Sequence, residues 1–322
     1  MISGRLLNRW WRNLSHEEKS RIIKKYKHHT KLLAFFGTSL VGYETWVYYR
    51  SIEICPYTGR KRFMILTKED MKEILGEPAD NELLQKSSVL SSNHPYYKSV
   101  KSIVDTIIVK NKEVFPELSG NWKLLIYDDD SIINAACLPN GEIIVYTGLI
   151  KFVENHHQLA VVISHELSHV ILEHGRETLG RMSILSIIVT VCGFALWTFV
   201  QGDFMAFLSN WLKNRIFRVC LELPYNRMLE SEADVLGLQM LARSCYDVNE
   251  AKKFWDIMSI FEKKTEISLP NWLCTHPLSE LRAKHLERLT PSASKLSKEC
   301  GCLVESSVYQ KILHQYKNLV YF

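Results

Sequence analysis

The sequence predicts a mainly helical α+β fold with a small antiparallel sheet and with segments that associate with a membrane. Two stretches, 157–173 and 224–243, have the spacing of apolar residues expected of helices. The region 121–148 contains three runs rich in Ile, Val, Leu and Tyr, separated by turn-forming residues, which is typical of strands. Two apolar runs, 32–49 and 182–202, would supply the membrane-associated segments.

Length and charge define the expected organisation. The 322 residues suffice for one core, and we expect a domain at 50–290 followed by a C-terminal tail at 291–322. The net charge is +5, but residues 1–31 alone carry +7, because nine Lys and Arg stand against Glu17 and Glu18. The rest of the chain is therefore close to neutral, and we expect no nucleic-acid partner.

Residues 1–31 are predicted to form a basic amphipathic arm. Four apolar residues fall on one helical stripe and three arginines lie outside it: Leu7, Trp10, Trp11 and Leu14 against Arg5, Arg9 and Arg12. An Arg-rich start that is free of acidic residues until Glu17 is typical of a mitochondrial targeting segment or of a helix on a membrane surface. A flexible, solvated arm is the alternative. The next segment, 32–49, is apolar except for Glu44 and is a candidate transmembrane anchor of marginal length.

The pentapeptide HELSH (165–169) lies within the helical stretch 157–173. Residues four apart share a helix face, so His165 and His169 can both reach one metal ion. Glu166 lies beside that face, where a carboxylate can take a proton from water activated by the metal. The motif therefore predicts a catalytic metal site.

The end of this helix is predicted from the two residues that follow it. His174 is a cation near the helix C-terminus, and Gly175 has the character of a glycine just after a helix. Metal binding by His174 is the alternative.

The third metal ligand must come from elsewhere, because a catalytic zinc takes three protein ligands and leaves a position for water. The stretch 224–243 offers three acidic residues, Glu230, Glu232 and Asp234. Glu230 and Asp234 share a stripe with the small residues Ala233 and Gly237, which would let another helix approach closely. We predict Glu230 as the ligand of one Zn²⁺ per chain, and Asp234 as the carboxylate that orients a ligand imidazole. Glu232 is expected to face solvent.

A further motif is Thr275-His276-Pro277, which precedes a helical stretch containing Arg282. His276 is expected on a loop over a cleft. His276 and Arg282 are predicted catalytic residues that stabilise the oxyanion of a tetrahedral intermediate; alternatively, His276 occupies the open metal position at rest.

Taken together, the motifs HELSH, LESEAD (229–234) and THPLSELR (275–282) resemble those of the HtpX-like membrane-associated zinc metallopeptidases, relatives of the prenyl-protein proteases. The likeness covers roughly 55–302 and is strongest to mitochondrial inner-membrane members of that family. It implies a zincin-like metallopeptidase domain at 50–290.

The resemblance also implies residue roles and a biological setting. Zinc would be held by His165, His169 and Glu230, with Glu166 as the catalytic base. The implied activity is a stress-activated, quality-control cleavage of inner-membrane proteins, including the dynamin-like GTPase of inner-membrane fusion, together with self-cleavage. The basic arm would lie on the matrix side, which places the catalytic domain in the intermembrane space.

The apolar run 182–202 separates the two predicted ligand helices. A single membrane crossing would put their ligands on opposite sides, although all must lie within ~2 Å of one zinc ion. We therefore expect the insert 182–212 to re-enter the membrane, to lie in its interface or to line a site at membrane depth. A hydrophobic helix pair packed on the domain is the alternative. The expected partners are protein substrates in or near the membrane, the lipid bilayer and, as an option, a second copy of the chain.

The strands and the cysteines complete the prediction. The region 121–148 is expected to be an antiparallel meander whose edge pairs with an extended peptide, or else a sheet with a solvated edge.

The eight cysteines lack CxxC pairs, which argues against a zinc ribbon and a dense disulfide framework. Cys300 and Cys302 are expected to be either redox-active or free surface thiols.

The sequence thus predicts a zinc metalloendopeptidase. One rival is a proteolytically inactive zinc-binding scaffold of the same fold. The other is a prenyl-peptide protease of the endoplasmic reticulum, which would need more membrane spans than the two candidates present.

Overall fold

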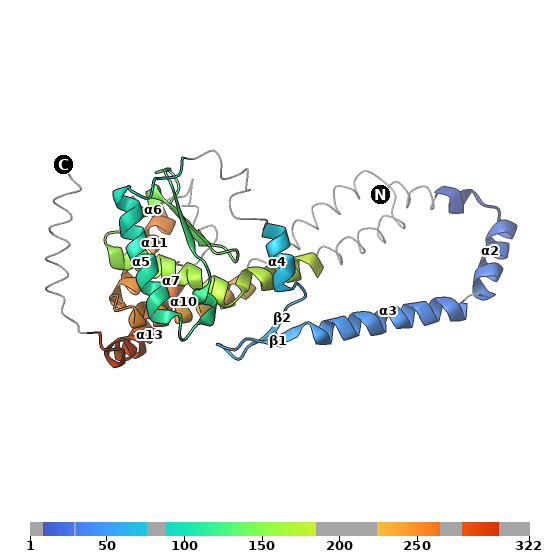
Figure 1. The fold of residues 1–322 in the computed structure, drawn as a ribbon. Helices are drawn as coiled ribbons and strands as arrows, with labels where there is room; N and C mark the ends of the chain where they lie inside the picture. The colour runs from blue at the N-terminus through green and yellow to red at the C-terminus, as the bar shows by residue number, and fades with distance from the viewer. Residues whose placement is uncertain (1–8, 29, 76–87, 185–223, 265–278, 303–322) are drawn as a thin grey trace. The chain divides into compact units, whose positions relative to one another are not determined.

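The computed structural model describes residues 9–28, 30–75, 88–184, 224–264 and 279–302 (Figure 1). Contacts group the chain into two compact units, one of 1–75 with 173–228 and the other of 76–172 with 229–322. Most of the predicted insert 182–212 and the predicted residue His276 lie outside the described residues.

The first unit contains helices and one two-stranded hairpin. Its elements are α2 (His16–His28), α3 (Thr30–Arg50), β1 (Ile52–Ile54), β2 (Lys61–Phe63), α4 (Lys68–Leu75) and a helical stretch at 174–184. Strands β1 and β2 are antiparallel, and Glu53 lies opposite Arg62. Gly59 adopts a φ of 68° between them, a conformation that glycine takes without a steric penalty.

Partly buried ion pairs hold this hairpin to the stretch 174–184. Arg60 binds Glu177 through two parallel hydrogen bonds of 2.7 Å. Arg176 donates to the Leu66 carbonyl at 2.5 Å and to Glu53 at 2.7 Å. Paired, charge-assisted bonds of this kind offset the cost of burying the side chains. We use the name ion-pair cluster for the charged residues Glu53, Arg60, Arg62, Glu173, Arg176 and Glu177.

The predicted anchor 32–49 is helical and lies within α3. Across the described parts of the chain, however, no helix has both the length and the apolar character that a membrane span requires. The transmembrane prediction for 32–49 is therefore not confirmed. Glu44 and the Thr, Ser and Tyr residues of the segment lower its mean hydropathy.

The second unit contains the main helices and a three-stranded sheet. Its elements are α5 (Pro95–Asn111), η2 (Pro116–Ser119), β3 (Lys123–Tyr127), β4 (Ala135–Cys137), β5 (Glu142–Tyr146), α6 (Thr147–Phe152), α7 (His156–Ile171), α10 (Pro224–Arg243), α11 (Asn249–Lys264) and α13 (Ser279–Glu299). Twelve of the sixteen residues of α7 are buried, which makes it the central helix of this core. The Asn155 side chain caps its N-terminus by accepting from the Gln158 amide at 3.0 Å.

The sheet corrects the predicted antiparallel meander. Its strand order is β3-β5-β4, with β3 and β5 parallel and only β4 and β5 antiparallel. The chain after β3 does not turn back alongside it but crosses the end of β5, where the Gly148 amide donates to the Asp129 carbonyl. A Cβ on Gly148 would stand 2.4 Å from the Ile132 carbonyl oxygen, so glycine allows this crossing. The sheet is small, as predicted, but mixed.

The end of α7 also differs from the prediction. The helix ends at Ile171, and Glu173, not Gly175, takes the left-handed conformation, with a φ of 54°. This conformation is unfavourable for a residue with a Cβ. The Glu173 carboxylate compensates by pairing with Arg176 and, at 3.1 Å, with Lys68. Gly175 lies inside the next helical stretch.

The C-terminal part of the described chain contains the predicted start of the tail and the two close cysteines. The predicted boundary at 290/291 falls inside α13, which continues through Pro291. Cys302 is neither a free thiol nor paired with Cys300, because it forms a disulfide with Cys245. Gly301, with a φ of 74°, turns the chain so that Cys302 is buried while Cys300 stays exposed and free.

Candidate metal centre

The site is built where α10 lies directly against α7. The backbone atoms N and Cα of His165 would stand 3.2 Å from a Cβ placed on Gly237, so a larger residue there would push the two helices apart. Ala233, one turn earlier on the same face, is fully buried. The prediction that small residues on α10 permit a close helix approach is confirmed.

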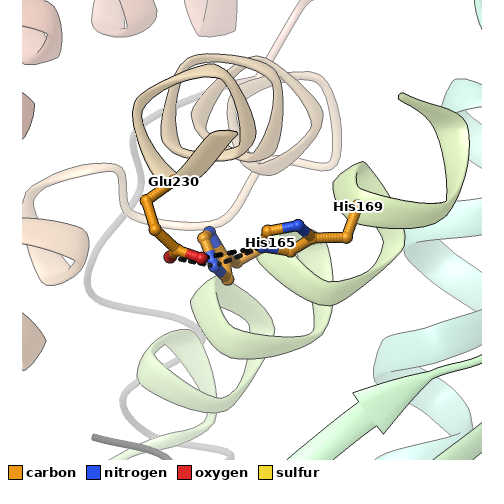
Figure 2. A group of neighbouring side chains, drawn as sticks. All are labelled: His165, His169 and Glu230. Carbon is orange, nitrogen blue, oxygen red and sulfur yellow. Dashed lines mark hydrogen bonds and ion pairs between the residues drawn. The ribbon is translucent and has the colours of Figure 1, made fainter. Parts of the chain in front are cut away.

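Three donor side chains converge across this contact: His165 and His169 from α7 and Glu230 from α10 (Figure 2). The Nε2 atoms of the two histidines are 3.1 Å apart. The Glu230 oxygens lie 3.3 Å from His165 Nε2 and 3.5 Å from His169 Nε2. Among the described residues, these three form the group of metal-ligand side chains that can share one ion.

These distances match the requirements of zinc. Tetrahedral bonds of ~2.0–2.1 Å hold neighbouring donor atoms ~3.3 Å apart, and two imidazoles with one carboxylate are a known catalytic ligand set. The two Nε2 atoms, 3.1 Å apart, and the Glu230 oxygens, Oε2 at 3.3 Å from His165 and Oε1 at 3.5 Å from His169, lie near that value. His165 and Glu230 are buried and His169 is half-buried, so one side of the group remains open to solvent. The residues present therefore fit a zinc ion.

Asp234 fixes which nitrogen of His165 faces the group. Its Oδ1 lies 3.3 Å from His165 Nδ1, which leaves Nε2 directed at His169 and Glu230. Burial and the Arg282 charge oppose protonation of the imidazole, but hydrogen bonds to Asp234 and Glu230 outweigh them and raise the pKa of His165 to about 9. A carboxylate on the outer nitrogen orients a ligand histidine and increases its basicity.

Arg282 connects Glu230 and Asp234, two of the three acidic residues of α10. Its Nε and Nη2 donate to Asp234 at 2.9 and 2.5 Å, and its Nη1 lies 2.6 Å from Glu230 Oε2. Nη2 is also 3.2 Å from both ring nitrogens of His165. One buried guanidinium thus balances two buried carboxylates. After burial, which acts in the opposite direction, the Arg282 charge is the main cause that lowers the pKa of Asp234.

Trp255 on α11 was not predicted from the sequence. Its ring centroid lies 3.5 Å from the Arg282 guanidinium carbon, and the residue is 1% exposed. It also meets the His165 ring edge-on at a centroid distance of 6.3 Å. No local sequence pattern indicates that Trp255 contacts Arg282, because a Trp in an amphipathic helix is usually an ordinary core residue.

Glu166 lies on the part of α7 that faces the sheet. It is buried, and β4 packs against α7. Burial and then the Glu166 charge raise the pKa of the Cys137 thiol, which places Glu166 close to the end of β4. Within the described sheet, β4 is an edge strand, because β5 lies on one side and no strand is placed on the other. The outer side of β3 is partly covered by a bridge between Val89 and Tyr127.

The structure thus brings together His165, His169, Glu230, Asp234 and Arg282, with Glu166 on the same helix as the two histidines. Glu232 is half-buried rather than solvated and is not part of the group. His174 is buried and also stands outside it. His276 lies outside the described residues, so its predicted role stays a prediction.

Comparisons with known proteins agree with this site. Over 307 residues the chain is 34% identical to the protein named metalloendopeptidase OMA1, mitochondrial, of Bos taurus, and 32% identical to that of Homo sapiens; each match covers 94% of this chain and 58% of the relative. The relative of the same name from Danio rerio is 30% identical, with 94% and 63% covered. The chain therefore spans about three fifths of the length of these curated relatives.

A model of peptidase family M48 matches residues 97–290, which is more than half of the chain. The matched range contains HELSH, both acidic residues of α10 that face α7, and Arg282. The convergence of these side chains and the extent of the match lead to one assignment: the chain belongs to peptidase family M48.

Proposed function

We propose that the chain is a zinc-dependent metalloendopeptidase whose zinc is held by His165, His169 and Glu230. The observation that carries the proposal is the separation of the three donor groups, 3.1 to 3.5 Å. The groups meet where α7 and α10 are in close contact at Gly237. A zinc ion there would polarise the scissile carbonyl and make a water acidic enough to attack near neutral pH.

Glu166 would be the general base of the reaction. It follows His165 directly on α7, and its charge acts on the thiol of Cys137 at the end of β4. Its carboxylate would take the proton of the attacking water and return it to the leaving amine. Arg282 is held by Asp234 and Glu230, so in this proposal it orients those carboxylates. Of the two residues predicted to contact the oxyanion, His276 is therefore the first candidate and Arg282 the second.

The substrate would bind as an extended strand along β4. This strand packs on α7 and ends at Cys137, near Glu166. A peptide that adds to this edge would form main-chain hydrogen bonds, so its backbone would be held with little dependence on sequence. Such binding suits an endopeptidase that cleaves exposed, membrane-proximal segments.

The proposed setting is the mitochondrial inner membrane, with the catalytic domain in the intermembrane space. The names of the relatives place those proteins in mitochondria, and the Arg-rich arm 1–31 has the composition of a targeting or membrane-surface segment. Stress-activated quality control, cleavage of the dynamin-like fusion GTPase, self-cleavage, association with the bilayer through 182–212 and self-assembly belong to this proposal as well.

The direct test compares Glu166→Gln and Glu230→Gln with wild type for zinc content and for cleavage of a membrane-tethered peptide. We expect Glu166→Gln to keep its zinc while losing activity by ~10²–10⁴-fold, because only the base is removed. Glu230→Gln should lose zinc as well. Glu113→Gln, an exposed change in the same unit, is the control and should match wild type.

Full activity of either site variant would contradict the mechanism. The inactive-scaffold alternative makes a different prediction, namely that wild type binds zinc, cleaves nothing, and has a cellular effect that Glu166→Gln leaves unchanged.

A further inference from the structure

We propose that Trp255 is a positioning residue for the metal centre: its indole face fixes the plane of the Arg282 guanidinium, and Arg282 in turn holds the metal ligand Glu230 and the His165 partner Asp234 in register. This inference rests on the proposed zinc site. It assigns a role to a residue on α11, a helix that contributes none of the ligands.

The first step is the stacking itself. The guanidinium carbon of Arg282 lies 3.5 Å from the Trp255 ring centroid, which is van der Waals contact over the ring face. Trp255 is 1% exposed and Arg282 6%. A cation held over an indole is stabilised most strongly when water is excluded, and tryptophan offers the best aromatic face for it. Stacking also leaves the in-plane N–H groups of arginine available for carboxylates.

The second step is what the plane of the guanidinium decides. Nε and Nη2 donate hydrogen bonds to Asp234, while Nη1 forms an ion pair with Glu230. Because the N–H groups form a rigid fork, a rotation that preserves one carboxylate contact loses the other. The indole face, which lies 3.5 Å from the guanidinium carbon, restricts this rotation and so supports the orientation in which both contacts are made. Arg282 without this support would keep its charge but lose the simultaneous contact.

The third step links that orientation to the metal ligands. Glu230 Oε2, which lies 2.6 Å from Arg282, is also the oxygen 3.3 Å from His165 Nε2. Asp234 Oδ1, which accepts from Arg282, also lies 3.3 Å from His165 Nδ1. A loosened guanidinium would therefore release a ligand carboxylate and the partner of a ligand histidine together. Loss of groups that orient metal ligands typically reduces metal affinity by ~10–100-fold.

Phe254 provides a matched control. It precedes Trp255 on α11, is 0% exposed, and meets Trp255 edge-on at 5.6 Å. Replacing either aromatic residue by leucine removes core volume and should lower the melting temperature. Only the replacement of Trp255 removes the face on which Arg282 lies.

The experiment measures Zn²⁺ affinity of the full chain, stripped of metal, by competition with a chromophoric chelator, with the melting temperature recorded for each variant. Trp255→Leu should bind zinc ~10–100-fold more weakly than wild type. Trp255→Phe, which keeps an aromatic face, should stay within ~3-fold. Phe254→Leu should lower the melting temperature and leave zinc affinity unchanged. If Trp255→Leu does not fold, Trp255→Met, whose unbranched and flexible side chain adapts more readily to the space left by the indole, takes its place.

A double-mutant cycle tests the route through Arg282. In an Arg282→Met background, Trp255→Leu should cause no further loss of zinc affinity, because the residue through which it acts is gone. Additive losses, or equal affinities for Trp255→Leu and Phe254→Leu, would overturn the positioning role. These outcomes are separate from failure of the proposed function, which would appear as wild type that binds no zinc.

Discussion

The ion-pair cluster of the first unit and the metal centre of the second both bury charged side chains, but they arrange them differently. In the ion-pair cluster of the first unit, carboxylates face guanidinium groups, as in the two-bonded pair of Arg60 and Glu177. In the metal centre of the second unit, acceptor atoms face one another: two imidazole nitrogens lie 3.1 Å apart with a carboxylate beside them. Buried charge alone therefore does not identify a functional site, because it occurs in both regions. What distinguishes the metal centre is that several potential metal-ligand atoms lie at the distances expected around one ion.

The largest expected contrast comes from neutralising one carboxylate in each region. Glu230→Gln should weaken zinc binding by on the order of 100-fold or more, because it removes a ligand and an Arg282 contact together. Glu177→Gln should leave zinc affinity within ~2-fold but cost about 2 kcal/mol of unfolding free energy, since it weakens two charge-assisted hydrogen bonds between the half-buried Arg60 and the buried Glu177. Zinc competition and chemical denaturation measure the two effects. A zinc defect in Glu177→Gln would remove the distinction between the regions.

Two glycines sharpen the same comparison. A Cβ on Gly237 would stand 3.2 Å from the His165 backbone, so Gly237→Ala must push α10 from α7 by a few tenths of an ångström. We expect zinc affinity to fall by ~10-fold, because a ligand-bearing helix moves. Gly175→Ala, with no atom within 4 Å of the new Cβ, should instead stabilise its helix by ~0.5–1 kcal/mol. Equal zinc affinities for both variants would show that the helix contact does not set the ligand spacing.

Features that depend only on residues close together in the sequence could be predicted from it. The histidine pair, and the preference for Glu230 over Glu232, depend on helix periodicity, which operates within a few residues. Gly237 was predictable for the same reason.

Features that depend on distant parts of the chain were not predictable. The order of strands depends on a crossing at Gly148, and the disulfide joins Cys245 to a residue 57 positions away. Trp255 reaches the site only because α11 packs on α13, which no spacing in either helix encodes.

A smaller effect is expected from acidification of the ion-pair cluster. Burial raises the pKa of Glu173, but hydrogen bonds from Arg176 and Lys68 outweigh it and leave the pKa below its ordinary value of 4.5. A carboxyl with a lowered folded-state pKa stabilises the fold above its unfolded-state pKa, and this contribution is lost as pH falls through the folded-state value. Denaturation between pH 6 and pH 3 should show wild type losing more stability than Glu173→Gln. Parallel curves would mean that Glu173 contributes no proton-linked stability.

The smallest effect concerns a hydrogen bond beside the metal centre. Ser231 Oγ and His285 Nε2 are 3.2 Å apart, next to Glu230 on α10 and one turn after Arg282 on α13. Ser231→Ala removes one half-buried hydrogen bond, so it should cost about 1 kcal/mol of unfolding free energy and change zinc affinity by less than ~2-fold. This contact joins the same two helices as Arg282 but touches none of the ligands. If Ser231→Ala weakened zinc binding as much as Trp255→Leu, general looseness between α10 and α13 would explain both variants, and the orientation of Arg282 would lose its special role.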